Sequence, residues 1–225
     1  MTAHSYVLLH DEPQSTAAPR DILELASLDT KREPVTSVDL QDFLAQTFPP
    51  RELMLSPWLQ RQGLAMVHGY RGLGKTLMAH GSAYAIATGG GFWRWRAPEP
   101  RKVLLIDGEM PAADLQTRLR NTQSNSELEP AQDYFRIAAA DTFRDGLPDL
   151  SNASMQGFYS DVVADAEFLL LDNISTLCPG AQENDADGWA VMQAWILQLR
   201  RQGKSVLLVH HDGKGGQQRG SVASS

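Results

Sequence analysis

Cysteine is almost absent from this chain of 225 residues: Cys178 stands alone, so no internal disulfide bond can form. There is no apolar run long enough to span a bilayer, and no signal-like segment near Met1. These absences argue against a secreted or membrane-embedded protein. They predict a reducing, cytoplasmic setting without a membrane partner.

Basic charge is also scarce, with 20 lysines and arginines against 27 acids and a formal net charge of -7. A surface of this sign does not attract nucleic acid, so any contact with DNA must come from local basic loops. A ring-shaped assembly can still concentrate a few basic residues in a central channel. Metal-type Cys/His spacing and internal repeats are missing as well.

What the chain does contain is a glycine-rich loop between a predicted strand and a predicted helix. Gly69, four intervening residues, Gly74, Lys75 and Thr76 match G-x-x-x-x-G-K-[ST], the P-loop pattern. Its glycines let backbone N–H groups curl round a phosphate, which Lys75 also reaches, while Thr76 offers a hydroxyl to Mg²⁺. The predicted nucleotide-binding residues are Gly69, Tyr70, Arg71, Gly72, Leu73, Gly74, Lys75, Thr76 and Leu77.

Apolar strands alternate with helices along the rest of the chain. Uninterrupted apolar runs suit strands that are buried on both faces of a parallel sheet. The pattern therefore predicts an α/β fold, a mostly parallel sheet sandwiched by helices, with its chemistry at the carboxyl edge. The predicted strands are residues 64–68, 102–107, 134–138, 167–172 and 205–209, and the predicted helices are residues 77–88, 111–120, 155–166 and 189–201.

Residues 1–50 are interpreted as an N-terminal arm, partly disordered with one short helix, and residues 51–225 as the ATPase domain. Ser37 or Asp39 can cap the short helix, which either docks a partner or packs on the core of its own chain. Aromatic residues and arginines alternate over residues 92–96, where they either stack nucleic-acid bases or cover apolar surface at the sheet edge.

Two of the buried strands end in an acid. Asp172 follows four apolar residues, the Walker B pattern, and is expected to hold Mg²⁺ directly or through a water. Asn173 follows it where many P-loop ATPases have the activating glutamate, so Glu109 is the candidate base that orients the attacking water. Glu109 can alternatively cap the following helix, and Asp107 is interpreted as structural.

Two histidines end the last predicted strand. One of His210 and His211 is expected to sense the γ-phosphate while the other packs, and His210 is favoured. Arg219 can act as an arginine finger toward a neighbouring subunit, contact nucleic acid, or be an ordinary solvated arginine.

In this combination the motifs resemble the RecA/DnaB-type ATPase core, and most closely the RepA-like hexameric replicative helicases and AAA_25-type ATPases of plasmids and phages. The resemblance runs from about Leu53 to Gly220. It rests on four motifs in the right order: the P-loop of residues 69–76, the strand and Asp-Gly-Glu-Met-Pro of residues 103–111, the Walker B strand of residues 169–172, and the strand-His-His-x-Gly-Lys ending of residues 206–214.

The resemblance implies a RecA-like P-loop NTPase core that binds ATP and Mg²⁺. It implies that Lys75 binds phosphate and that Thr76 binds Mg²⁺. It further implies that Glu109 is the catalytic glutamate and Asp172 the Walker B acid. His210 or His211 would be the γ-phosphate sensor. It also implies a homo-oligomeric, hexameric ring with nucleotide between subunits and single-stranded DNA in the centre.

Members of that group usually continue past the Arg-Gly-Ser of residues 219–221 with further strands, which leaves open whether this core is truncated at its C-terminal strands. The acidic loop of residues 179–187 suits DNA binding poorly. The predicted function is an ATP-hydrolysing, DNA-linked motor of plasmid- or phage-type replication. The alternatives are a non-translocating ATP switch, such as a regulator or helicase loader, and a small-molecule kinase.

Overall fold

The computed structural model describes residues 35–180 and 186–211. Its contacts divide the chain into two units, residues 1–49 and residues 50–225. The described part of the first unit contains the helix α2 (Leu40–Ala45), none of whose residues is buried. Of the two predicted caps, Asp39 is the one that the structure has, and its carboxylate accepts a hydrogen bond from the Gln41 backbone N–H at 2.9 Å.

The second unit alternates strands and helices, as the apolar pattern predicts. Its helices are α3 (Lys75–Thr88), α4 (Ala112–Ser124), η1 (Ala140–Thr142), α5 (Ala153–Gln156), η2 (Gly157–Tyr159), α6 (Ser160–Ala164), α7 (Ile174–Leu177) and α8 (Ala186–Arg201). Its strands are β1 (Leu53–Leu55), β2 (Leu59–Gln60), β3 (Leu64–Gly69), β4 (Gly91–Phe92), β5 (Trp95–Arg96), β6 (Val103–Asp107), β7 (Phe135–Ala139), β8 (Phe168–Asp172) and β9 (Ser205–His211).

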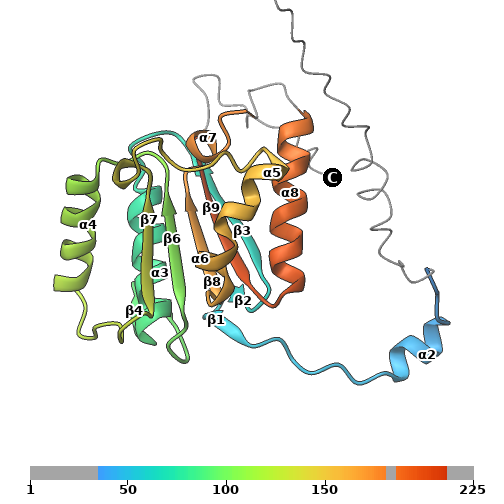
Figure 1. Ribbon diagram of the computed structural model, residues 1–225. Coiled ribbons are helices and arrows are strands. Elements are labelled where there is room, and N and C mark those ends of the chain that lie inside the picture. Colours follow the sequence, from blue (N-terminus) through green and yellow to red (C-terminus); the bar gives the residue numbers. More distant parts are fainter. Residues whose placement is uncertain (1–34, 181–185, 212–225) are drawn as a thin grey trace, which may run out of the picture. The chain divides into compact units, whose positions relative to one another are not determined.

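Five of these strands form one sheet in the order β3-β9-β8-β6-β7, and every neighbouring pair is parallel (Figure 1). Parallel pairing brings the carboxyl ends of all five strands to one edge. The register sets Asp107 opposite Asp172 and Gly69 opposite His211. The sheet thus gathers the ends of five separate chain segments, the P-loop strand among them, along a single edge.

Helices cover both faces of the sheet, which confirms the predicted α/β sandwich with a RecA-like P-loop core. One hydrophobic cluster joins β6, β8 and β9 to α6, α7 and α8, and the other joins the opposite side chains of these strands to α3 and α4. Every residue of β6 and β8 is buried, as expected for apolar runs in the middle of a parallel sheet. One face of α8 belongs to the core, since Met192, Ile196 and Leu199 are buried.

The helix predicted over residues 155–166 is wrong as one continuous element. The chain instead makes α5, one turn of 3₁₀ helix (η2), and α6. Asn152 caps the first piece, its side chain accepting from the Ser154 backbone N–H. Gly157 then begins η2, and glycine is the residue that least favours a helix interior after proline.

The aromatic stretch of residues 92–96 forms the antiparallel pair β4 and β5. Phe92 and Trp95 pack against the cluster on the α3 side of the sheet, and Trp58 meets Trp95 edge to face at 5.4 Å. Trp93 remains 67% exposed. Coverage of apolar surface therefore explains Phe92 and Trp95, whereas Trp93 is left facing outward.

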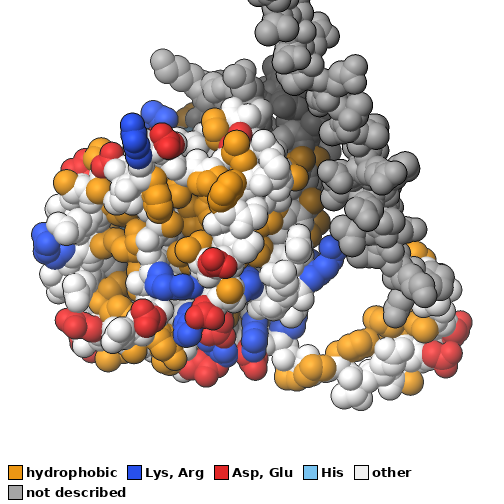
Figure 2. All heavy atoms as spheres, in the orientation of Figure 1, with side chains coloured by type: hydrophobic (Ala, Val, Ile, Leu, Met, Phe, Trp, Pro, Cys, Tyr) orange, Lys and Arg blue, Asp and Glu red, His pale blue; other side chains and the backbone are white. Residues whose placement is uncertain are grey.

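Charged side chains of both signs gather at the lower end of the second unit (Figure 2). They include the ion pairs of Arg101 with Glu52, Glu99 and Glu167 and the pair Lys102–Asp165, around the amino ends of β6 and β8.

Within the described residues, no helix combines the length and apolar character that a membrane crossing requires.

Candidate nucleotide site

The P-loop curves between β3 and α3 with a backbone that glycine makes possible. Gly72 and Gly74 have φ angles of +86° and +81°, in the left-handed region that residues with a Cβ rarely adopt. A Cβ at either position would meet no atom within 4 Å, so conformation and not crowding requires glycine there. Both glycines thus leave open space beside the loop, which fits a phosphate-binding cradle.

Lys75 lies inside this loop. Its ammonium donates to the carbonyl oxygens of Gly69 at 2.6 Å and Tyr70 at 2.7 Å, and the residue is only 6% exposed. It also begins α3, a helix of 14 residues whose first N–H groups point at the loop and add the positive end of the helix dipole. A cation and a helix N-terminus converge on the same loop, an arrangement that attracts phosphate.

The other predicted loop residues divide by exposure. Thr76 is half-buried, whereas Tyr70, Leu73 and Leu77 are exposed by 52%, 70% and 57%. These three apolar side chains point away from the core. Their backbone groups, and not their side chains, are what the loop offers to a phosphate.

Asp172 ends β8 beside the first turn of α3. It is 3% exposed, and the Thr76 hydroxyl is a hydrogen-bond partner of its carboxylate. Burial raises the pKa of Asp172 to about 7, and the nearby Asp107 carboxylate adds to the rise. Hydroxyl and carboxylate oxygens are hard ligands, and Asp172 Oδ2 has no hydrogen-bond partner among the described residues, so the pair fits Mg²⁺.

Glu109 is held at the same edge by side chains from three other segments. The Asn173 side-chain amide donates to Oε2, and His211 Nε2 lies 3.2 Å from the same oxygen. Arg71, from the P-loop, lies 3.6 Å from Oε1. The glutamate side chain is 40% exposed, so it is fixed in position and still reachable from outside.

Asp107 shapes the turn that presents Glu109. Its Oδ1 accepts from the backbone N–H groups of Glu109 at 3.0 Å and Met110 at 2.7 Å, in agreement with the predicted structural role. Burial raises the pKa of Asp107 above its ordinary value, although the two backbone donors act in the opposite direction.

The two histidines at the end of β9 differ in surroundings. His211 contacts Glu109, whereas His210, which the sequence favoured as the sensor, is 7% exposed and lies opposite His68 in the sheet register. The preference for His210 is therefore not supported by the contacts at Glu109, which belong to His211. Arg219 lies outside the described residues.

Three residues at this edge were not anticipated in these positions: Arg71 and Asn173 against Glu109, and His80 beside Asp172. His80 Nε2 lies 3.6 Å from Asp172 Oδ2, and burial lowers the pKa of His80 to about 4, so its imidazole is neutral near pH 7. The sequence did hold one signal for it. His80 comes four residues after Thr76 and so shares its face of the helix.

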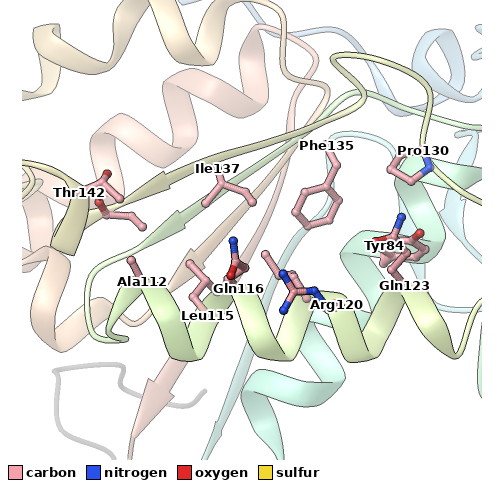
Figure 3. A pocket seen from close by; sticks show the side chains of 12 residues that line it. Tyr84, Ala112, Leu115, Gln116, Arg120, Gln123, Pro130, Phe135, Ile137 and Thr142 are labelled. Atoms are coloured by element: carbon pink, nitrogen blue, oxygen red, sulfur yellow. Dashed lines mark hydrogen bonds between the residues drawn. The ribbon is translucent and has the colours of Figure 1, made fainter.

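A cavity of about 510 Å³ lies elsewhere, between α4 and β7. Figure 3 shows Leu115, Gln116 and Arg120 of α4 facing Ile137 and Phe135 of β7 across it. No predicted site residue lines this cavity. The predicted site residues therefore lie away from this cavity.

Comparison with known families agrees with the geometry. The AAA_25 family model, described as an AAA domain, matches residues 29–217. That range covers the P-loop, Glu109, Asp172 and both histidines of β9. A search of curated proteins finds no match. The match spans most of the 225 residues, and the chain therefore belongs to the AAA_25 family of P-loop, AAA-type ATPase domains.

Proposed function

We propose that this protein hydrolyses ATP and couples hydrolysis to single-stranded DNA, as a motor of the RepA-like helicase type. The observation that carries the proposal is the position of Glu109, which Asn173, His211 and Arg71 hold beside the P-loop. A P-loop alone is common to kinases, switches and hydrolases. A fixed, accessible carboxylate next to it is what the hydrolysis of ATP by water requires.

Different residues of the site bind the phosphates and the metal ion. Backbone N–H groups of the loop and the start of α3 bind the phosphates, and the Lys75 ammonium exchanges its contacts with Gly69 and Tyr70 for phosphate oxygens. Thr76 and Asp172 are the residues that would hold Mg²⁺. When bound, this ion neutralises charge on the β- and γ-phosphates.

Glu109 serves as the base. It accepts a proton from the attacking water, whose oxygen forms a bond to the γ-phosphorus while the bond to the bridging oxygen of ADP breaks. The products are ADP and inorganic phosphate. Arg71 and His211 act as positioning residues, because they contact the carboxylate from the P-loop and from the end of β9. His211 thereby links the glutamate to the end of β9.

A ring of identical subunits with DNA in its centre belongs to the same proposal and rests on the resemblance of the motifs to hexameric helicases. The acidic charge of -7 makes any DNA contact local and sensitive to salt. Sedimentation of the full chain with a non-hydrolysable ATP analogue tests the ring. A hexamer is expected, whereas a monomer at all concentrations contradicts this part of the proposal.

Steady-state ATP hydrolysis at low salt, with and without single-stranded DNA, tests the function itself. Glu109→Gln should lower turnover about 1,000-fold while ATP still binds, because an amide cannot accept the proton. Glu127→Gln, a change at an exposed glutamate away from the site, is the matched control and should leave turnover unchanged.

The other outcomes are equally informative. Hydrolysis of ATP that does not respond to DNA would support the proposed ATPase activity and contradict the proposed DNA motor. Binding of ATP without turnover in the unaltered chain replaces the motor by an ATP switch of the regulator or loader type. Transfer of the γ-phosphate to a metabolite would make the protein a kinase.

A further inference from the structure

Three buried side chains meet just inside the nucleotide site. His80 comes from α3, Asp107 from the end of β6 and Asp172 from the end of β8. They are 1%, 1% and 3% exposed, and one potential ligand atom of each lies within 4.8 Å of the other two. We propose that His80, Asp107 and Asp172 form a binding site for a first-row transition-metal dication, of the class of Co²⁺, Zn²⁺ and Mn²⁺.

The fold brings these side chains together by two independent rules. The parallel register pairs Asp107 with Asp172 on neighbouring strands. His80 follows Thr76 by one helical turn, so it extends the face of α3 that the P-loop turns toward Asp172. The same elements that build the nucleotide site therefore build this cluster.

Two polar atoms inside the cluster have no hydrogen-bond partner among the described residues: His80 Nε2 and Asp172 Oδ2. They face each other at 3.6 Å, which is too long for a hydrogen bond. Buried polar atoms are nearly always paired, because leaving one unpaired is costly. A metal ion between them would satisfy both at once.

The spacing is close to what such an ion needs. A metal about 2.1 Å from each ligand atom separates two ligands by about 3.4 Å in a tetrahedral site. The 3.6 Å between His80 and Asp172 is near that value. Asp107 Oδ1 already serves the turn at Glu109 and Met110, which leaves Oδ2 for the metal. Three protein ligands leave a position for water, as in catalytic zinc sites.

The donor set decides the class of metal. Mg²⁺ keeps oxygen ligands and several waters, whereas an imidazole nitrogen favours the transition metals. The two acids and the imidazole are buried together, so a dication that binds here replaces the acids' protons and compensates the negative charge that is left. Asp172 is shared with the Thr76 pair, so a metal here would fix the orientation of the Walker B carboxylate.

The site is inferred from these residues alone and does not depend on ATP hydrolysis. It is therefore tested on the untagged full chain without nucleotide, after treatment with a chelator. We expect Co²⁺ to bind with the visible absorption of a four- or five-coordinate ion. Mg²⁺ should compete only at a concentration about 100-fold higher or more.

His80→Gln should weaken Co²⁺ binding about 100-fold, and Asp107→Asn should weaken it as well. His68→Gln removes an exposed histidine outside the cluster and is the matched control, with unchanged binding expected. Circular dichroism and thermal melting establish that each variant is folded. Equal Co²⁺ affinity in His80→Gln, or equal competition by Mg²⁺, would overturn the proposal.

A measurement on the unaltered protein covers the case in which His80→Gln does not fold. Pulsed electron paramagnetic resonance of bound Mn²⁺ should detect coupling to an imidazole nitrogen. Binding through oxygen and water alone would also overturn the proposal. None of these experiments includes nucleotide. A protein that binds Co²⁺ but does not hydrolyse ATP would therefore contradict the proposed function and still support this metal site.

Discussion

The two ends of the parallel sheet carry charged residues in opposite arrangements. At the amino end, the terminal nitrogens of Arg101 form ion pairs with Glu167, Glu52 and Glu99. The Lys204 ammonium there donates hydrogen bonds to the carbonyls of Ala164 and Ala166. At the carboxyl end, His80 and Asp172 keep buried polar atoms without a hydrogen-bond partner among the described residues.

We interpret the amino end as a region that stabilises the fold and the carboxyl end as the region that binds ligands. At the amino end the terminal nitrogens of Arg101 pair with glutamates and Lys204 is bound by carbonyls, although Arg101 Nε also lacks a hydrogen-bond partner among the described residues. At the carboxyl end an acid and a histidine lie close together, and Asp172 Oδ2 and His80 Nε2 have no hydrogen-bond partner among the described residues. Such an arrangement is unfavourable for the folded protein alone and becomes favourable when phosphate or metal is bound.

Removal of the P-loop cation should have the largest effect. Lys75→Ala is expected to weaken ATP binding about 1,000-fold, about 4 kcal/mol, because the phosphates lose a buried ammonium. Lys102→Ala is the matched change at the amino end, where Lys102 pairs with Asp165 at 3.5 Å, and should leave affinity unchanged. Titration with a fluorescent ATP analogue measures both. Similar losses in the two variants would remove the contrast between the ends.

The acid of the carboxyl end should make stability fall as pH rises. In the folded protein the pKa of Asp172 is raised from 3.8 to about 7, so the folded state holds a proton that the unfolded chain releases. Its contribution to the free energy of unfolding therefore declines from about pH 4 to about pH 7. Asp172→Asn lacks this decline and should gain on the unaltered protein by up to about 4 kcal/mol between pH 4 and pH 8.

Urea unfolding in the presence of a chelator measures this gain. Asp165→Asn, a change at an exposed acid of the amino end, is the control and should follow the pH dependence of the unaltered protein. Parallel pH curves for all three proteins would mean that Asp172 is not strained by its burial.

The residues that hold Glu109 should have a smaller effect, confined to turnover. Asn173→Ala removes the amide that donates to Glu109 and should lower kcat about 30-fold with little change in ATP affinity, since the loop is untouched. Asn125→Ala, at the exposed end of α4, is the matched control. A rise in KM with unchanged kcat would instead make Asn173 a binding residue.

Much of the fold followed from short-range patterns. The apolar runs that became β6 and β8 predict buried strands because burial on both faces leaves no place for polar residues. The strands of the β1–β2 and β4–β5 pairs, two or three residues each, carry no period that a sequence can reveal. The break at Gly157 was missed because one glycine within a helical pattern does not show that the hydrogen bonds change there from the α to the 3₁₀ pattern.

The site was predictable where a residue's role depends on its neighbours in sequence. Lys75 and Thr76 follow from the P-loop spacing, and Asp172 from the apolar run before it. The contacts of Arg71, Asn173 and His211 with Glu109 depend on how loops from different strands meet, which spacing within one segment does not encode. His211 shows this most clearly. It is the neighbour of His210 in sequence, and the structure alone shows that His211 is opposite Gly69 and contacts Glu109, whereas His210 is opposite His68.

The smallest effect is expected at the amino end and in stability alone. Arg101→Met keeps the apolar stem and removes the guanidinium, whose side chain is 13% exposed and meets three glutamates. The free energy of unfolding should fall by about 1 to 2 kcal/mol, and less at high salt, because partly exposed ion pairs are screened. Arg61→Met breaks a more exposed pair, with Glu52, and should cost less. ATP affinity should not change in either variant, because the sheet separates these charges from the P-loop; a loss of binding in Arg101→Met would show that the two ends are coupled.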